Sequence, residues 1–294
     1  MELSRLPEHP SSGSARANLD RATVEGFGEE WSAFDQSGLT GAAYQQAFDN
    51  YFRNFPFDRL PKGAEGFDLG CGSGRWALGV APRVGKLHCI DPAEKALEVA
   101  RRRLAGLPNV RFHLASVDSI PLPASSQDFG YSLGVLHHVP DTGRALADCV
   151  AKLKPGAPFL LYLYYRLDGR PLLYRAVWRA TNILRRGLCR LPFPARKAVT
   201  TAIARLVYWP LARGARIAEG TGRDVGNWPL SFYRSLPFYV MRTDALDRFG
   251  TRLEQRFSRA EVEALMRRAG LVDIRFSESE PYWVALGWRR KAGE

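Results

Sequence analysis

Three glycines and two carboxylates form a pattern that suits the binding of a nucleoside-like ligand. The segment Asp68-Leu-Gly-Cys-Gly-Ser-Gly74 ends an apolar run and precedes a helical pattern. Glycines at every second position allow a tight turn and let the backbone approach a ligand that a Cβ atom would exclude. The helix that follows offers unpaired backbone N–H groups at its start. The second carboxylate, Asp91, ends the next apolar run seventeen positions beyond Gly74, where an acid can accept both hydroxyls of a ribose.

Other interpretations of these residues are an ordinary glycine turn and a dinucleotide site. Counted from Gly70, the dinucleotide pattern G-x-G-x-x-G needs Gly or Ala at position 75, where the chain has Arg75. The chain also lacks the Tyr-x-x-x-Lys pair of short-chain dehydrogenases. A nicotinamide cofactor is therefore disfavoured. Asp91 has a structural alternative of its own, as a helix N-cap before Pro92.

Two adjacent histidines, His137 and His138, follow the apolar run 130–135. A neutral imidazole near pH 7 suits a general base that removes a proton from a hydroxyl, an amine or an acidic carbon. The alternative is that one of the pair is structural. No carboxylate cluster suggests a metal, and the four cysteines are widely spaced without a Cys-x-x-Cys pair. We therefore predict no metal site and a reducing, cytoplasmic compartment.

Short apolar runs alternate with helical patterns from about residue 66 to residue 165. The elements that these patterns predict must position the glycine segment, Asp91 and the two histidines. Helical stretches of the kind seen at 92–107 and 141–153 separate the runs, which predicts a parallel α/β sheet. Near the C-terminus, Ser258-Arg-Ala-Glu261 is a capping box that begins a helix ending at Gly270. Two further runs, 272–278 and 282–288, are joined by a link so short that only an antiparallel hairpin fits.

Five segments in this order resemble the motifs of the class I S-adenosylmethionine (SAM)-dependent methyltransferases that act on small molecules. They are Asp68–Arg75, Cys89–Ala93, Leu114–Pro123, Asp128–Asp141 and Leu153–Ala157. The resemblance implies a Rossmann-like seven-stranded sheet with helices on both faces and the strand order 3-2-1-4-5-7-6, strand seven being antiparallel. It also implies an N-terminal helical cap and a helical insertion after strand five.

The resemblance names SAM as the cofactor and assigns residues to its parts. Gly70 and Gly72 would reach the methionine and ribose portions, and Asp68 would hold the methionine amino group. Ser116 and Val117 would lie against adenine; the family often has Asp where Ser116 stands, so Asp118 is the alternative partner of the exocyclic amine. Arg75 either meets the methionine carboxylate or lies exposed on its helix, and Trp31, in a cap segment spanning 26–34, either covers the cofactor or packs within the cap. The predicted cofactor-binding residues are Trp31, Asp68, Gly70, Cys71, Gly72, Gly74, Arg75, Asp91, Pro92, Ser116, Val117, Asp118 and Leu133.

The predicted insertion, residues 167–244, carries the charge imbalance of the chain. Residues 169–218 contain eleven Lys and Arg and no acid, and the rest of the chain then has 31 cations against 30 acids. Apolar residues recur in it at helical spacing. Three interpretations of these cations are open: they form a solvated helix face, a surface that binds anionic lipid, or a surface that binds nucleic acid. The third is disfavoured because no RNA-binding module accompanies the cations. Aromatic residues at 227–239 either form a lid over the acceptor or pack as the core of the insertion. Tyr233 among them is the third candidate catalytic residue, beside His137 and His138.

The whole composition is that of a globular protein: 294 residues, 46% hydrophobic and 24% charged. No apolar stretch approaches the roughly 18 residues of a membrane span. We divide the chain into a mobile tail (1–20), a helical cap (21–62), a core (63–166), the insertion (167–244) and a core completion (245–294).

These observations predict a SAM-dependent methyltransferase acting on the oxygen, nitrogen or activated carbon of a small or lipid-linked metabolite, with an anionic acceptor compatible with the basic charge. Two alternatives stay open: an enzyme that attacks the aminobutyrate arm of SAM and releases methylthioadenosine, and a non-catalytic membrane-associated binding protein. Peripheral contact with an anionic membrane and a homodimer are also compatible with the sequence.

Overall fold

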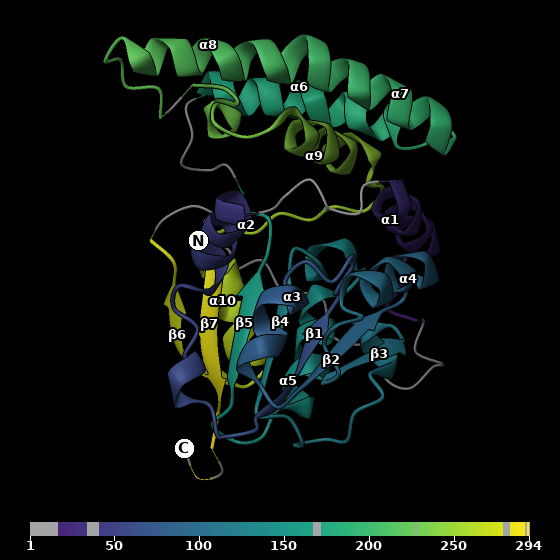
Figure 1. Ribbon diagram of the computed structural model, residues 1–294, viewed down its shortest axis with the longest axis vertical. Coiled ribbons are helices and arrows are strands. Elements are labelled where there is room, and N and C mark those ends of the chain that lie inside the picture. Colours follow the sequence, from purple (N-terminus) through teal and green to yellow (C-terminus); the bar gives the residue numbers. More distant parts are fainter. Residues whose placement is uncertain are drawn as a thin grey trace, which may run out of the picture.

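A seven-stranded sheet with helices on both faces forms the body of the molecule in the computed structural model (Figure 1). The structure describes residues 17–33, 41–166, 172–226, 228–278, 283–291 and 293. The strands are β1 (Glu65–Leu69), β2 (Lys86–Asp91), β3 (Val110–Leu114), β4 (Phe129–Leu133), β5 (Pro158–Tyr162), β6 (Leu271–Phe276) and β7 (Val284–Arg289). The helices are α1 (Arg21–Ala33), α2 (Gly41–Phe52), α3 (Ala77–Val80), α4 (Glu94–Arg103), α5 (Thr142–Lys152), α6 (Leu172–Leu188), α7 (Phe193–Ile203), α8 (Trp209–Gly220), α9 (Phe238–Gly250) and α10 (Arg259–Arg268).

The expected strand order is confirmed. The strands run β3-β2-β1-β4-β5-β7-β6; β1 to β5 pair in parallel, and β7 is antiparallel to both β5 and β6. The capping box at Ser258 and Glu261 is present at the start of α10. The hairpin link at 279–281 lies outside the described residues.

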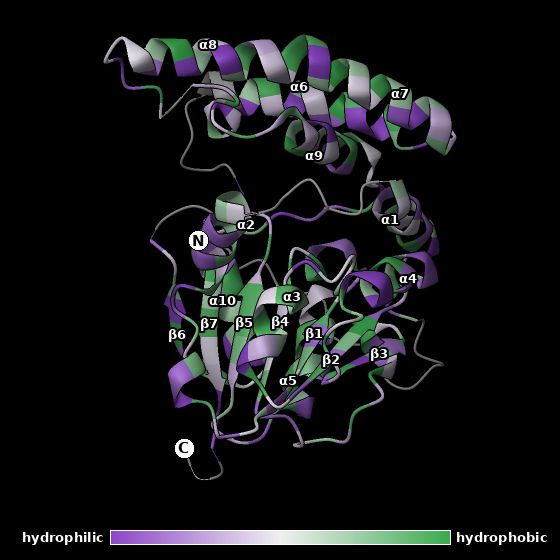
Figure 2. Ribbon diagram, viewed as in Figure 1, coloured by the Kyte–Doolittle hydropathy of each residue, from purple (hydrophilic) through white to green (hydrophobic). Residues whose placement is uncertain are grey.

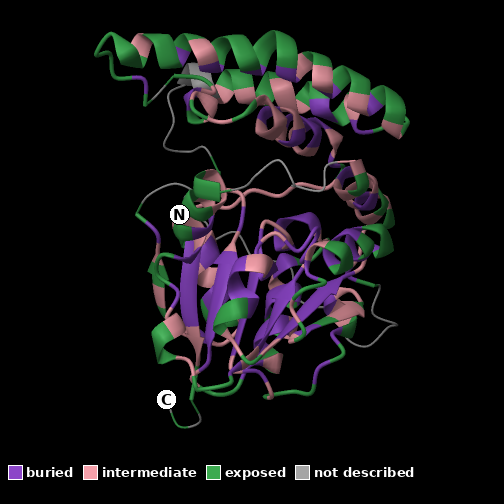
Figure 3. Cartoon of the chain, viewed as in Figure 1, coloured by how far each residue is buried: buried purple, intermediate pink, exposed green. Residues whose placement is uncertain are grey.

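Two hydrophobic clusters hold the helices to the sheet. Side chains of α5 and α10 pack on one face, and those of α2, α3 and α4 pack on the other. Neighbouring residues of β5 serve opposite clusters, since Phe159 and Leu161 face the first and Leu160 the second. Strands buried on both sides read as continuous apolar runs, which is why β5 was recognisable in the sequence. Figures 2 and 3 show this apolar, buried sheet.

The insertion lies beyond one end of the sheet, above the helix α1 (Figure 1). It comprises α6, α7, a π-helical turn η5 (Ala204–Tyr208), α8, a 3-10 turn η6 (Ser231–Tyr233) and α9. A small core of its own joins η5 and α8 to α9 through Tyr208, Ala212, Met241, Ala245 and Phe249. The expected boundary at residue 244 falls inside α9, which continues to Gly250. The apolar residues of α9 pack into this core, so the whole helix belongs to the insertion.

The predicted tail also ends earlier than expected. Asn18 is buried, and its side-chain amide donates to the carbonyl of Asp141 (2.8 Å) while accepting from the N–H of Asp141 (2.8 Å). The backbone N–H of Asn18 donates to Asp118 (2.9 Å). These three bonds join residues 18–20 to the core. The polar sequence did not indicate these bonds, because their partners lie 100 and 123 positions away.

Candidate active site

The loop after β1 turns sharply at three glycines. Gly70, Gly72 and Gly74 have φ angles of 76°, 52° and 73°, in the left-handed region that favours glycine. A Cβ atom on Gly72 would come within 3.1 Å of the Trp31 ring. One on Gly70 would come within 2.4 Å of the Val135 side chain. A side chain at Gly72 would therefore crowd the cap, and one at Gly70 would collide with the loop after β4, so both positions favour glycine.

A cavity opens where these loops meet the cap. It spans about 940 Å³ of space, which includes open solvent at its mouth. It lies at the carboxyl ends of β1, β2 and β4, the edge where open α/β sheets bind ligands. The lining comes from the cap segment, the glycine loop and the ends of these strands: Asn18, Leu19, Asp20, Thr23, Val24, Phe27, Trp31, Leu69, Gly70, Cys71, Gly72, Ser73, Arg75, Trp76, Asp91, Pro92, Ala93, Val117, Leu133, Gly134, Val135, Leu136, His138 and Val139.

Asp91 lies on the cavity wall at the end of β2. One carboxylate oxygen accepts from the N–H of Gly72 (2.9 Å) and the other from the N–H of Ala93 (2.9 Å). Burial raises the pKa of Asp91 to about 6, although both backbone N–H groups oppose that rise. Each carboxylate oxygen has two lone pairs, so each retains one for a hydroxyl of a ligand. Ala93, not Asp91, is the N-cap residue of α4.

Asp68 lies off the cavity wall and is 1% exposed. Its Oδ2 has no hydrogen-bond partner among the described residues. Burial, with a smaller contribution from the nearby Asp91 charge, raises the pKa of Asp68 to about 8, although an interaction of the carboxyl group with the Tyr131 hydroxyl opposes that rise. A buried carboxylate with an unused oxygen beside a ligand cavity is matched to a cationic group such as an amine.

The remaining predicted cofactor residues divide into two groups. Trp31, Cys71, Arg75, Pro92, Val117 and Leu133 line the cavity with Gly70, Gly72 and Asp91, whereas Gly74, Ser116 and Asp118 do not. Gly74 lies against α4, where a Cβ atom would be 2.8 Å from Leu104. Asp118 bonds to the Ser116 hydroxyl and to Asn18. It therefore anchors the cap segment, a role that the sequence did not suggest.

The two histidines occupy a 3-10 turn, η4 (Leu136–His138), and differ in their surroundings. His138 lines the cavity, and its Nδ1 lies 2.7 Å from the carbonyl oxygen of Leu253. A carbonyl only accepts, so Nδ1 carries the proton, and Nε2 of the neutral ring is left as an acceptor. His138 Nε2 is buried without a partner among the described residues. Burial lowers the pKa of His138 below its usual value.

His137 is fully buried and lines neither described cavity. Its ring packs 3.9 Å, centre to centre, from those of His138 and Tyr164. Neither of its ring nitrogens has a hydrogen-bond partner among the described residues. Burial holds the pKa of His137 well below its usual value, so the ring is neutral and acts as packing.

The segment after α9 fixes the histidine turn from the insertion side. The Leu253 carbonyl accepts a hydrogen bond from His138. In addition, the N–H of Gln255 donates to the carbonyl of His137 (2.9 Å). The Gln255 side chain donates to the carbonyl of Val139 (2.6 Å). The sequence offered no signal for Leu253 or Gln255, because the first acts through its backbone and both contact a turn more than one hundred positions away.

Tyr233 lies within the insertion and lines neither described cavity. It packs against the core formed by Tyr208, Met241 and Phe249, and its hydroxyl interacts with Asp244. Burial raises the pKa of Asp244 to about 6. This placement agrees with the alternative in which the aromatics pack as the core of the insertion. Asn227, in the same aromatic segment, and Phe34, in the cap segment, lie outside the described residues.

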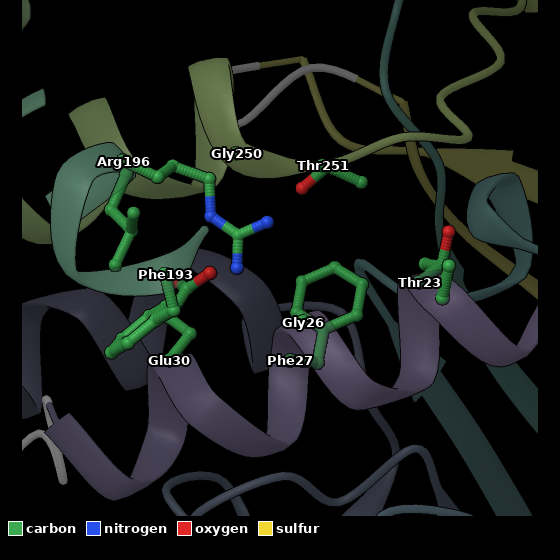
Figure 4. Close-up of a pocket in the computed structure, with 10 residues that line it drawn as sticks. Thr23, Gly26, Phe27, Glu30, Phe193, Arg196, Gly250 and Thr251 are labelled. Carbon is green, nitrogen blue, oxygen red and sulfur yellow. The ribbon is translucent and has the colours of Figure 1, made fainter. Parts of the chain in front are cut away.

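A second, smaller cavity separates α1 from the insertion (Figure 4). Arg196 of α7 reaches into it and pairs with Glu29 (3.1 Å). Glu30 lies on the same wall, and burial raises its pKa well above the usual value. The contacts in this cavity join the cap, which also lines the larger cavity, to the insertion, which does not. Among the described residues, no group of three or more His, Cys, Asp and Glu side chains is placed to hold a metal ion.

Comparisons with known proteins agree with this geometry. Residues 67–161 match a family model described as a methyltransferase domain. Over 139 residues the chain is 33% identical to an uncharacterized 37.1 kDa protein in transposon TN4556 of Streptomyces fradiae, covering 45% of this chain and 38% of that protein. Over 153 residues it is 29% identical to the ubiquinone biosynthesis O-methyltransferase of Methylocella silvestris, covering 47% of this chain and 59% of that enzyme. These matches span well under two thirds of either relative.

One solved structure shares the fold over most of the chain. It comes from a complex between the Trm112 methyltransferase activator of Haloferax volcanii and a candidate methyltransferase. The match covers 92% of this chain and 99% of that one, with a TM-score of 0.52 and 15% identity. At that identity, the match concerns the fold alone.

The sheet and the cavity at its carboxyl edge define the class as a Rossmann-like α/β protein with a nucleoside-binding site. Residues 67–161 match a methyltransferase domain, and SAM is the cofactor that such a domain of the class I type would bind. The residues present fit SAM: the glycine loop leaves room for it, Asp91 has lone pairs for the ribose, and the unpartnered Asp68 oxygen matches the methionine amino group.

Proposed function

We propose that this protein transfers the methyl group of SAM to an oxygen, nitrogen or activated carbon of a small or lipid-linked metabolite, and that His138 removes the acceptor's proton. When bound, SAM supplies a methyl group already activated by its positive sulfur. The chain must therefore align the acceptor and, where the acceptor carries a proton, accept it. The O-methylation named for the Methylocella relative supports a small-molecule acceptor.

The observation that carries the proposal is the fixed tautomer of His138. The Leu253 carbonyl requires the proton on Nδ1 of His138. The lone pair on Nε2 has no hydrogen-bond partner among the described residues. The His138 side chain also lines the cavity. Burial lowers the pKa of this ring, so it is neutral at pH 7 and ready to accept a proton. Gln255 and Leu253 hold the turn in place, which keeps the base oriented before the acceptor binds.

The test compares variants of two adjacent histidines. His138→Ala should lower kcat by about 10²–10⁴ while SAM affinity, measured by calorimetry, changes much less. His137→Leu is the matched control, because its ring nitrogens make no hydrogen bond among the described residues and a branched apolar side chain keeps the packing. Turnover is followed by mass spectrometry of the nucleoside formed from SAM, with aqueous and lipid fractions of a cell extract as acceptor sources.

The nucleoside product separates the outcomes. S-adenosylhomocysteine that disappears with His138→Ala but not with His137→Leu supports the proposal. Methylthioadenosine would show attack on the aminobutyrate arm instead. Equal turnover by both variants would leave positioning alone as the mechanism, and SAM binding without any product in either fraction would favour a binding protein.

A further inference from the structure

The outward side of the insertion exposes a row of large apolar side chains. Helices α7 and α8, joined by η5, run continuously from Phe193 to Gly220. Their inner side packs on α9. Leu206 lies about two helical turns after Val199, and Ile217 lies about three turns after Leu206. The side chain of Leu206 is 74% exposed and that of Ile217 is 72% exposed. Trp209 and Leu211 flank this row and are also exposed. Figure 3 shows the largely exposed outer helices beyond the buried sheet.

Helix α6 has an outer side of the same kind. Val177, Ile183 and Leu184 are exposed there, Ile183 at 70%. The inner side of α6 is occupied, since the guanidinium of Arg185 donates to the carbonyls of Thr251 (2.6 Å) and Arg252 (3.1 Å). These outer side chains are therefore not needed to fold the insertion. Large apolar residues gathered on one exposed surface mark a contact with a partner or a membrane.

The charge around these residues identifies the partner's chemistry. Arg179, Arg186, Arg205 and Arg216 are exposed on α6, η5 and α8, and residues 169–218 contain no acid. Other cations of the insertion have structural partners: Arg185 as above, Arg196 with Glu29, and Arg213 with the carbonyls of Arg234 and Leu236. The exposed cations thus lie among apolar side chains on these helices, where the exposed carboxylate of Glu219, near the end of α8, pairs with Arg234 and also interacts with Arg216. A second copy placed against this surface would bring like charges together.

We propose that the outer surface of α6, α7, η5 and α8 binds the face of a bilayer that contains anionic phospholipids. The arginines would contact the headgroups, and Leu206, Trp209 and Ile217 would enter the boundary between headgroups and acyl chains. Among the described residues no helix is long and apolar enough to cross a membrane. In this orientation the insertion lies between the sheet and the membrane (Figure 1). The proposal does not depend on which acceptor is methylated, nor on whether methyl transfer occurs.

The test is co-sedimentation of the full chain with vesicles. Phosphatidylcholine vesicles that contain about 30% phosphatidylglycerol should bind the protein at low salt, and pure phosphatidylcholine vesicles should bind it much less. Raising the salt to about 0.5 M should release most of the bound protein, because exposed charges are then screened. A salt-resistant remainder is expected from the apolar side chains.

Two variants separate the charged and apolar contributions. Replacing Arg179, Arg186, Arg205 and Arg216 by Gln should weaken binding to anionic vesicles at least tenfold, because each cation near a membrane surface contributes about fivefold. Leu206→Gln with Ile217→Gln should remove the salt-resistant remainder. The matched control replaces four exposed cations of the core and cap side, Arg59, Lys62, Arg102 and Arg268, and so changes the net charge equally.

Unchanged SAM affinity and circular dichroism in each variant would show that the fold and the cofactor site are intact. The proposal is overturned if wild type ignores anionic vesicles at low salt, or if the control set weakens binding as much as the insertion set. A dimer in wild type that Leu206→Gln and Ile217→Gln convert to a monomer, with no vesicle binding, would assign the surface to a second copy instead. Binding only to an acidic protein would likewise overturn it.

Discussion

At the scale of single residues, Asp91 has a structural role, and it keeps hydrogen-bonding capacity that a ligand could use. Its two oxygens hold the N–H groups of Gly72 and Ala93, so the carboxylate joins the glycine loop to the turn before α4. Each oxygen keeps a second lone pair, and Asp91 lines the larger cavity. Asp68 behaves differently, because it is buried behind the loop with an unused oxygen.

We expect Asp91→Ala to weaken SAM binding by about 1–3 kcal/mol, the cost of leaving hydroxyl groups unpaired. Calorimetry with adenosine and with adenine separates the ribose contact from a general loss of loop structure. Adenosine affinity should fall while adenine affinity should hold. If both fall equally, Asp91 supports the loop only, and if neither falls, it has no part in binding.

At the scale of elements, the cavity depends on two segments that approach it from distant parts of the chain. Residues 18–20 and α1 cover one side, tied down by Asn18, Asp118 and Asp141. The segment after α9 holds the histidine turn through Leu253 and Gln255. Arg196 and Glu29 connect α7 to α1. Cap and core therefore enclose the larger cavity, and the insertion is linked to the cap.

Asn18→Ala should loosen the cap, because it removes two side-chain hydrogen bonds with the Asp141 backbone. We expect SAM affinity to fall by about 1–2 kcal/mol and amide hydrogen exchange to rise in residues 19–33. Asn54→Ala, at an exposed position, is the control and should change neither. Faster exchange with unchanged affinity would show that the cap does not hold the cofactor.

At the scale of the whole molecule, buried ionisable groups should make the stability of the ligand-free protein depend on pH. Burial raises the pKa of Asp68 to about 8 and lowers the pKa values of His137 and His138. The histidines stabilise the folded state above their unfolded pKa near 6.5 and lose that effect as the pH falls. Asp68 has the opposite sign: its folded state binds the proton more tightly, so its contribution is lost as the pH rises through 8.

Between pH 6.5 and 8.5 the histidines add at most about 0.4 kcal/mol each, in the opposite direction, so Asp68 should dominate among these groups. The free energy of unfolding should fall by about 1–2 kcal/mol over that range, seen as a decrease of a few degrees in the thermal midpoint. Asp68→Asn should make the decrease smaller, and a remainder is expected from Glu30 and Asp91, whose pKa values burial also raises. Saturating SAM should also make the decrease smaller, because a bound ammonium group lowers the pKa of Asp68. A midpoint that rises with pH in wild type would contradict the assignment.

Local patterns in the sequence predicted the parallel sheet, and its resemblance to a known family predicted the strand order, which the structure confirms. Glycines at alternate positions, an acid at the end of β2 and continuous apolar strands are local patterns, because backbone conformation and two-sided burial act on neighbouring residues. The sequence also predicted that Gly70, Asp91 and His138 lie near one another. Each follows or ends a parallel strand, and the carboxyl ends of parallel strands lie at the same edge of the sheet.

Only the tertiary structure decided which residues meet across the chain. It made Asp118 an anchor for Asn18, gave His138 its tautomer through the Leu253 carbonyl, and placed Tyr233 in the core of the insertion. It also divided the cations of the insertion into buried and exposed ones, although all look alike in the sequence. These distinctions depend on contacts between positions far apart in the chain and on backbone atoms that every residue carries, so no local pattern of side chains records them.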